Sequence, residues 1–318
     1  MTVSRALHGS PLVANETRET ILALAKEMNY VPNMSAKFLR GSKTNIVGFI
    51  VEDNTNPYCA HIIQQVQKLM RAADYHVLTF NNFENVDDEI EIVRTLCSFN
   101  VAGVLLTPAR GNSEGAAILR RSDVPYVLTS RYAAEGDDNY VIIDNVRTGY
   151  LAARHMLERH RRKTFFFNQY KGISSVDNRT KGYLRAVREA GLEPGADWIR
   201  YNCATRQDGY EAMRDLLKQE AAPFSVLCYN DYVAEGVLSS IYATDLKIPD
   251  DIAVMGIDNI ESFAIGRQKL TTVDVQTNEV AARSSALLLD LIKAREEGLS
   301  LPDRQIILEP RIVEGGTT

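Results

Sequence analysis

Six short polar segments, each after an apolar run, carry the residue types that bind small molecules. Their sequences are EDNTNPY (52–58), TPARG (107–111), SRY (130–132), NQY (168–170), YND (229–231) and IDN (257–259). Asp and Asn can hydrogen-bond to hydroxyl groups, and a Tyr ring can stack on the apolar face of a sugar ring. Any one segment is compatible with an ordinary turn, because Asn, Asp, Gly and Pro favour turns. Six together predict a binding site for a small polyhydroxylated ligand.

Most motifs of common catalytic sites do not occur in the sequence. It contains no GxGxxG after a strand, no GxxxxGKS/T and no HExxH, although GNSEG (111–115) has the GxSxG spacing. Dinucleotide, phosphate-loop and zinc-hydrolase chemistry therefore lack a starting motif. The five histidines are dispersed, and the four cysteines form no CxxC pair. We predict a protein that is not an enzyme, with reduced buried thiols and without a metal or cofactor.

The polar segments are separated by a regular alternation of strands and helices. Strands are expected at 45–51, 76–80, 102–108, 124–130 and 140–145, and a second series at 163–168, 198–202, 225–230 and 253–258. Repeated βα units predict parallel sheets with helices on both faces. Two series predict two doubly wound lobes, and ligands of such sheets bind beyond the carboxyl ends of the strands. The polar segments lie at those ends.

Length, composition and charge are consistent with a multidomain soluble protein. The chain has 318 residues, 45% apolar and 24% charged, which exceeds the usual size of a single core. It has no apolar run near the ~18 residues of a membrane helix and no signal-peptide pattern, so we expect a cytoplasmic protein. The net charge of −5 divides into +3 for residues 1–45 and −8 for the rest, as in nucleic-acid binders with a separate sensing domain. The run RHRRK (159–163) could complement a helix dipole or bind nucleic acid.

The N-terminal residues predict a small helical headpiece, here meaning residues 1–32. TVSRALHG reads like the second half of a helix, and a further helix is expected over 16–29 with Asn15 as its cap. The residues expected to form its core are Val3, Leu7, Thr17, Ile21, Leu24, Ala25 and Met28. Residues 33–41 predict a helix too short to be stable alone.

The sequence from TVSRALHG to GFIV resembles the N-terminal region of the lactose/galactose/purine repressor family of bacterial transcription regulators. The resemblance continues through NPYCAHIIQQVQ, VAGVLLTP, IIDNVRTGYLAARHML, NRTKGYLRAV, NDYVAEGV, MGIDN and LTTVDVQ. It implies the end of a helix-turn-helix, a third helix, a hinge, and a core similar to periplasmic sugar-binding proteins. The expected fold is thus α/β, with two doubly wound parallel-sheet lobes after a partial all-α helix-turn-helix headpiece.

The resemblance implies a DNA-binding role for residues of the headpiece and the hinge. These residues are Thr2, Ser4, Arg5, Asn33, Ala36 and Leu39. Leu39 matches a leucine that wedges into the minor groove, although it could instead pack on its own lobe. Relative to the family, the first helix, the turn and the start of the recognition helix are missing before Met1. We therefore expect weak operator binding by the chain as given, and in-frame upstream DNA encoding about 15–20 more residues.

The resemblance also implies an effector site between the lobes. The residues that match are Tyr58, Arg131, Arg179, Asn230, Asp231 and Asp258. Arg179 corresponds to an arginine that contacts the ligand, and Asp258 to the aspartate that faces it. The sequence departs from many relatives at Ser130, where they have an aspartate, and this departure weakens the assignment of Arg131 and leaves the ligand's identity open.

The expected organisation is a headpiece (1–32), a hinge (33–44) and a two-lobed domain (45–318). Lobe one is expected to comprise about 45–144 plus 275–297, and lobe two about 145–274 plus 298–318, with a helix at 276–295 crossing back over lobe one. The resemblance implies a repressor whose operator affinity is switched allosterically by a sugar or sugar derivative. A homodimer is favoured over a tetramer, because no leucine-heptad tail follows GGTT.

Two other classes of protein remain open at this point. A cytosolic small-ligand-binding module without DNA function is possible because the headpiece is incomplete. An enzyme with a two-lobed fold is disfavoured by the missing motifs. The sequence leaves open whether the effector is an inducer or a corepressor, and which operator and genes are controlled.

Overall fold

The computed structural model describes residues 2–7, 11–28, 30, 44–111, 114–133, 138–160, 162–260 and 268–318. The chain divides into two compact units, 1–44 and 45–318, and each is considered by itself. Asn33, Ala36, Leu39 and the expected hinge helix lie outside the described residues.

The first unit contains α1 (Thr2–Leu7) and α2 (Asn15–Glu27), which pack against each other. Among the described side chains of the two helices and their connection, Ala6 and Val13 are buried. Much of the expected core is wrong: α2 has no buried residue, and Leu24 and Met28 are 53% and 68% exposed, while the predicted core residue Leu7 has its side chain outside the described residues. One reason is that α1, with six residues, is too short to cover the length of α2.

The start of α2 also differs from expectation. Ala14 is the N-cap residue and makes no side-chain cap hydrogen bond, while Asn15 is the first helical residue. The predicted Asn15 cap is therefore wrong by one position. The exact residue at which a helix begins varies more readily than the presence of the helix.

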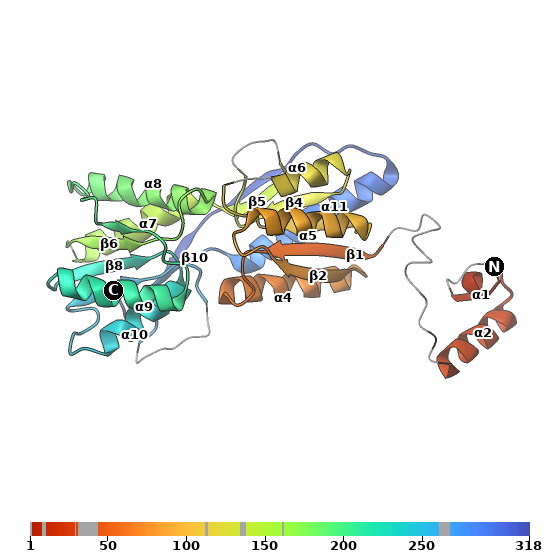
Figure 1. Cartoon of the computed structure of the whole chain (residues 1–318), viewed down its shortest axis with the longest axis horizontal. Coiled ribbons are helices and arrows are strands. Elements are labelled where there is room, and N and C mark those ends of the chain that lie inside the picture. The colour runs from red at the N-terminus through yellow and green to blue at the C-terminus, as the bar shows by residue number, and fades with distance from the viewer. Residues whose placement is uncertain are drawn as a thin grey trace. The chain divides into compact units, whose positions relative to one another are not determined.

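Lobe one of the second unit is built on a parallel six-stranded sheet, in the order β11-β5-β4-β3-β1-β2 (Figure 1). Its strands are β1 (Ile46–Val51), β2 (His76–Asn81), β3 (Gly103–Leu106), β4 (Tyr126–Thr129), β5 (Tyr140–Ile143) and β11 (Gln305–Leu308). Its helices are α4 (Pro57–Ala72), α5 (Val86–Ser98), α6 (Glu114–Arg121) and α11 (Thr277–Glu297).

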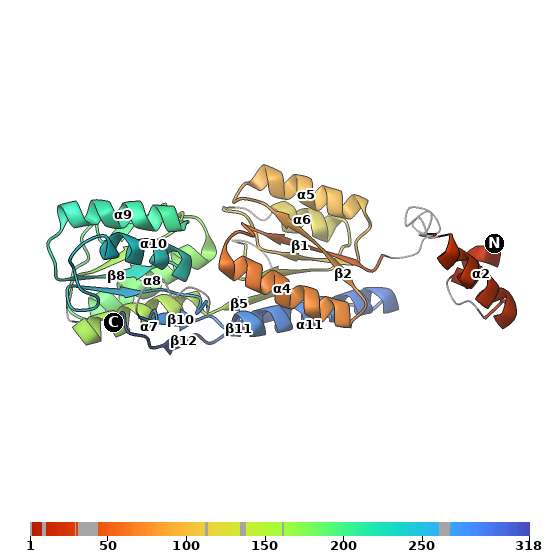
Figure 2. The same ribbon diagram turned by 90° about the horizontal axis from the view of Figure 1, so that it is seen from below.

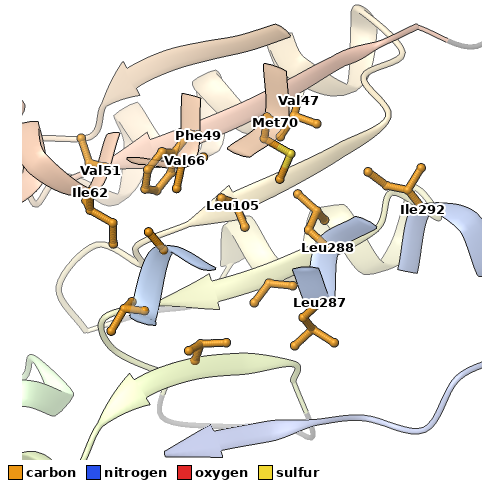
Figure 3. Close-up of a cluster of buried hydrophobic side chains, with 14 of the residues drawn as sticks. Val47, Phe49, Val51, Ile62, Val66, Met70, Leu105, Leu287, Leu288 and Ile292 are labelled. Carbon is orange, nitrogen blue, oxygen red and sulfur yellow. The ribbon is translucent and has the colours of Figure 1, made fainter. Parts of the chain in front are cut away.

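Alternation along the strands of lobe one separates two apolar layers. Val47, Phe49 and Val51 of β1 pack with α4 and α11, whereas Ile50 packs in the layer that α5 and α6 cover. Figure 3 shows the first of these layers, with Met70 of α4 near β1 and Leu288 of α11 near Leu105. Figure 2 shows α4 and α11 together on one side of the sheet and α5 and α6 on the other. The predicted crossing of the 276–295 helix over lobe one is confirmed by these contacts.

Lobe two repeats this arrangement around the parallel sheet β7-β6-β8-β9. Its strands are β6 (Thr164–Phe167), β7 (Ile199–Arg200), β8 (Phe224–Cys228) and β9 (Ile252–Met255). Its helices are α7 (Asn145–His160), α8 (Ser174–Glu189), α9 (Arg206–Gln219) and α10 (Asp231–Tyr242). One apolar cluster joins the sheet to α7 and α8, and another joins it to α9 and α10. The predicted α/β class with two doubly wound lobes is confirmed.

The chain passes between the lobes at three places. It leaves lobe one after β5, returns between β10 (Thr272–Asp274) and α11, and leaves again between β11 and β12 (Arg311–Val313), which pairs with β10. This differs from the expected assignment of 298–318 to lobe two, because β11 pairs in parallel with β5 in the sheet of lobe one. Periodicity identifies a strand but does not say which sheet it joins.

Other expectations concern membranes and thiols. Within the described parts of the chain, no helix is both long and apolar enough to cross a bilayer. All four cysteines are free; Cys59, Cys203 and Cys228 are buried and Cys97 is half-buried.

Candidate functional site

A small polar cavity lies between the lobes of the second unit, at the carboxyl ends of their strands. Its lining residues are Glu52, Asn56, Tyr58, Ser130, Arg131, Ile143, Ser175, Arg179, Tyr229, Asn230, Asp258, Val275 and Val280. Five of the six predicted effector residues are in this set, and Asp231 is not. The geometry expected for doubly wound sheets explains why segments so distant in sequence meet here.

Arg179 is fixed by contacts within lobe two. Its Nε donates to Asn145 Oδ1 at 3.0 Å and one terminal nitrogen donates to the Tyr229 carbonyl at 2.6 Å. The guanidinium also lies over the Tyr229 ring, 4.5 Å from its centroid. The other terminal nitrogen is 3.9 Å from Asp258 Oδ1, which is beyond hydrogen-bond distance. This nitrogen and the carboxylate can therefore both reach a ligand group placed between them.

Glycines bring α7 and α8 into close contact and so set the position of Arg179. A Cβ on Gly182 would overlap the Val146 carbonyl of α7, and a Cβ on Gly149 would overlap the backbone of Arg179 itself. Only glycine allows two helix backbones to approach so closely.

Asp258 is buried in the turn after β9, with its N–H donating to the Val273 carbonyl at 2.9 Å. Burial raises the pKa of its carboxyl well above the ordinary value, against the opposing effect of Arg179. Its φ of 119° is in a region that side chains rarely adopt, and Ser130, Asn259 and Gln276 near the cleft also have positive φ. Such strain is commonly found at ligand-binding sites, where the surrounding structure must maintain it.

Arg131 is engaged mainly with protein groups. Its two terminal nitrogens donate to the two carboxylate oxygens of Glu84 at 3.0 and 2.8 Å, and one of them lies 3.5 Å from Glu52. Burial lowers the pKa of Arg131, but the charges of Glu84 and Glu52 outweigh it and the net shift is upward. The bidentate pair makes Arg131 a support for the cavity wall with few donors left for a ligand.

Two hydroxyl pairs complete the cavity. Tyr58 Oη lies 2.7 Å from Ser130 Oγ, and Tyr229 Oη lies 2.9 Å from Ser175 Oγ. Burial raises the pKa of both tyrosines, so they remain neutral hydroxyls. Within each pair either oxygen can donate, so each pair can turn an acceptor or a donor toward a ligand.

Asn230 and Asp231 have structural partners at the start of α10. Asn230 Oδ1 accepts from Val233 N at 2.8 Å and caps the helix. The Asp231 carboxylate accepts from Thr272 Oγ1 at 2.6 Å and from Ile260 N at 2.9 Å. Burial raises the pKa of Asp231 to about 7. Asp231 thus joins α10 to the chain around β10 and lies beside the cavity lining.

Several lining residues were not singled out from the sequence. Glu52, Asn56 and Tyr229 lie within the polar segments that follow the strands, so their position was a usable signal. Ser175 is in the first turn of α8, and nothing in the local sequence distinguishes it from a helix-starting serine.

Two larger hollows adjoin the cavity. A groove of about 710 Å3 shares Tyr58 and Asp258 with it and continues past His61, which bonds to Asn278 at 2.8 Å. A hollow of about 250 Å3 on another side shares Arg131 and includes Tyr132. The described chain therefore offers room around the inner cavity for a ligand larger than the cavity itself.

In the first unit, Thr2 and Arg5 are exposed on α1, while the Ser4 side chain lies outside the described residues. The basic run at 159–163 is used elsewhere: Arg162 donates to the carbonyls of Pro249 and Asp250, and Lys163 pairs with Glu220. These contacts give Arg162 and Lys163 a structural role. Among the described residues, no cluster of His, Cys, Asp and Glu could hold a metal ion.

Comparison with known proteins extends over both units. Residues 44–306 match the family described as "Periplasmic binding proteins and sugar binding domain of LacI family", and residues 1–33 match "Bacterial regulatory proteins, lacI family". The HTH-type transcriptional repressor PurR of Serratia proteamaculans (strain 568) is 29% identical over 318 residues, covering 99% of this chain and 93% of the relative.

Solved structures show the same architecture. A complex of the transcriptional regulator CelR with cellobiose has 25% identity and a TM-score of 0.77, covering 100% of this chain and 95% of that one. The lac repressor dimer bound to operator and the anti-inducer ONPF has 20% identity and a TM-score of 0.84, covering 99% and 94%. With these matches over both units, the chain belongs to the LacI family of bacterial regulatory proteins.

Proposed function

We propose that this protein is a DNA-binding transcriptional repressor whose affinity for its operator is switched by a small molecule bound between the lobes of residues 45–318. The observation that carries the proposal is the buried cavity at the lobe junction, where Arg179 of α8 faces Asp258 at 3.9 Å. Burying charged and polar groups around a space is costly unless they bind something or each other. A ligand with several hydroxyl groups can satisfy them.

A carbohydrate fits the chemistry of this cavity. Hydroxyl groups both donate to Asp258 and accept from Arg179, and the Tyr58 and Tyr229 rings offer faces for an apolar sugar surface. The cellobiose complex of the relative CelR supports the same class of effector.

The switch follows from the way the lobes are connected. Three chain crossings join them, after β5, before α11 and after β11, so the lobes can rotate about these crossings. An effector that binds one arrangement better shifts the equilibrium toward it. A coupling free energy of about 1–3 kcal/mol is enough for a roughly 5- to 150-fold change in operator affinity. In a homodimer in the cytoplasm, such a rotation would alter the spacing of the two DNA-binding units.

DNA contact is assigned to the first unit and the segment after it. Thr2, Ser4 and Arg5 of α1 are the proposed base and backbone contacts, with Asn33, Ala36 and Leu39 as the proposed minor-groove contacts. The net positive charge of residues 1–45 supports this assignment.

The test combines operator selection with effector screening. The purified chain is used to select binding sites from the DNA around its own gene, and fluorescence anisotropy then measures affinity with and without each member of a sugar panel. We expect one sugar to change the operator affinity at least about fivefold. Absence of any sequence-specific site would contradict the regulator and favour the sensing module, whereas turnover of a sugar would favour a two-lobed enzyme. The match of residues 1–33 to regulatory proteins favours the regulator.

A further inference from the structure

The carboxyl groups of Glu52 and Asp258 and the guanidinium groups of Arg131 and Arg179 line the cavity, and they differ in how many hydrogen bonds and ion pairs they make within the protein. Both terminal nitrogens of Arg131 are bound by Glu84. Arg179 donates from two of its three nitrogens to Asn145 and to the Tyr229 carbonyl. The remaining terminal nitrogen of Arg179 lies 3.9 Å from Asp258 Oδ1, which is beyond hydrogen-bond distance.

The side chains of Glu52 and Asp258 make fewer close contacts with charged partners than the guanidinium groups make with their hydrogen-bond acceptors. Glu52 directly follows β1, its side chain is 16% exposed, and its ion pair with Arg131 is 3.5 Å long. Glu52 also interacts with the Cys59 thiol, whose pKa is raised well above its ordinary value by burial and by the charge and hydrogen bond of Glu52. Asp258 is 6% exposed and 3.9 Å from Arg179. A ligand in the cavity therefore meets acceptors on two sides.

The charged side chains immediately around the cavity also include more carboxyl groups, which accept hydrogen bonds, than guanidinium groups, which donate them. Glu52 and Glu84 supply two carboxylates at Arg131, and Asp258 supplies a third carboxyl group that faces Arg179. In a buried site charges are weakly screened, so a carboxylate such as Glu52 disfavours a ligand of the same sign.

We infer that the cavity selects an uncharged, hydroxyl-rich effector and rejects its phosphorylated or carboxylated derivatives, with Glu52 and Asp258 as the residues that enforce this choice. The inference rests on the proposed function, because it specifies the ligand class of the same site. Hydroxyl groups can donate to both carboxylates while accepting from the free nitrogen of Arg179. A phosphoryl group can donate little and would have a single guanidinium nitrogen to bind, since Arg131 already holds Glu84.

The first experiment uses inorganic phosphate as the probe, so that it does not depend on knowing the effector. Thermal unfolding of the full chain and of Arg179→Gln is followed in phosphate and in chloride at equal ionic strength. We expect phosphate to give no stabilisation that depends on Arg179. A phosphate-induced rise in the unfolding temperature that disappears in Arg179→Gln would overturn the inference, because it would show an anion site in the cleft.

The second experiment removes the carboxylate charges at constant shape. Glu52→Gln and the double variant Glu52→Gln/Asp258→Asn are compared with Glu158→Gln, an exposed substitution on α7. We expect phosphate to stabilise the double variant and, to a smaller extent, Glu52→Gln, but not Glu158→Gln. If neither charge-neutralised variant gains phosphate binding while both unfold cooperatively, Glu52 and Asp258 do not enforce the selection.

The third experiment compares matched ligands by calorimetry: glucose with glucose 6-phosphate and gluconate, and ribose with ribose 5-phosphate. We expect any anionic member to bind at least about tenfold more weakly than its neutral parent. An anionic member that binds more tightly than its parent contradicts the inference. Operator binding is measured separately, so a chain that binds no operator would refute the proposed function and leave these phosphate results unchanged.

Discussion

Tyr132 of lobe one and Ser174 of lobe two are joined by two hydrogen bonds across the cleft. Ser174 Oγ accepts from Tyr132 N at 3.2 Å and donates to the Tyr132 carbonyl at 2.8 Å. Asn178 adds a third contact, donating to Tyr132 Oη at 2.9 Å, and Gly111 N donates to the Gly172 carbonyl nearby. The lobes therefore bind each other directly on this side of the cavity, and opening them breaks these bonds.

Ser174→Ala should shift the effector-free protein toward an open arrangement. Each of the two lost hydrogen bonds contributes about 0.5–1.5 kcal/mol, so the open population should rise several-fold. Small-angle X-ray scattering is expected to show a larger radius of gyration than in wild type. Ser98→Ala is the control, because Ser98 donates to a carbonyl within α5. Equal scattering from both variants would mean that the Ser174 bonds do not hold the lobes together.

Arg179→Ala should weaken effector binding by at least about tenfold. A hydrogen bond to a charged group contributes about 1.5–3 kcal/mol, and Arg179 supplies the cation of the cavity that faces Asp258. Calorimetry with the effector found by screening measures the loss. Arg185→Ala is the matched control on the same helix, since Arg185 is exposed and pairs with Glu189. Unchanged affinity in Arg179→Ala would remove this residue from the site.

The sequence predicts the location of the cleft better than the hydrogen bonds and ion pairs within it. Polar segments after the strands had to meet because parallel strands of one sheet end at the same edge. Glu52 was part of such a segment, yet its burial depends on Arg131 and Glu84, which lie far away in sequence. Asp231 could be assigned to the cleft by resemblance, but its bonds to Thr272 and Ile260 depend on a tertiary contact with the turn before β10.

The short strands show a related limit. β10 and β12 have three residues each and pair antiparallel, so they give too little alternation to be recognised. β11 has four residues, and its place beside β5 is decided by the path of the chain after α11.

A third prediction concerns pH. Burial raises the pKa of Glu89 to about 7, although its Oε2 accepts hydrogen bonds from Ala109 N at 2.5 Å and from Asn82 Nδ2 at 3.2 Å. Because the folded pKa exceeds the unfolded one, the folded state binds more protons, and the contribution to stability falls as pH rises from about 4.5 to about 7. The loss is on the order of 3 kcal/mol at most. Glu89→Gln should therefore raise the unfolding temperature at pH 8 relative to wild type by more than it does at pH 4.

The matched control is Glu91→Gln, an exposed position on the same helix. Its unfolding temperature should follow that of wild type between the two pH values. A Glu89→Gln variant with an unchanged pH profile would show that this carboxyl does not titrate in the expected range.

A fourth prediction tests the close contact of α7 and α8. In Gly182→Ala the new methyl group would overlap the Val146 carbonyl, so the helices must separate at a cost of about 1–3 kcal/mol. Arg179 is one turn earlier on α8 and should move with it. We expect both a lower unfolding temperature and weaker effector binding, measured by calorimetry and calorimetric titration. Lys181→Ala, an exposed neighbour, should change neither property strongly; a neutral Gly182→Ala would contradict the close contact.

The last prediction separates base reading from charge in the DNA-binding unit. Arg5 is exposed in the last turn of α1, and Lys26 is exposed in the last turn of α2. If Arg5 hydrogen-bonds to a base, Arg5→Gln should cost about 1–3 kcal/mol on the selected operator and relax the preference at one position. Lys26→Gln removes the same charge from another helix, so it should weaken all sequences about equally and reduce the salt dependence of binding. Anisotropy titrations of both variants on the operator and on its single-base variants, at two salt concentrations, measure the two effects. Equal losses on specific and nonspecific DNA for Arg5→Gln would place this arginine on the phosphate backbone.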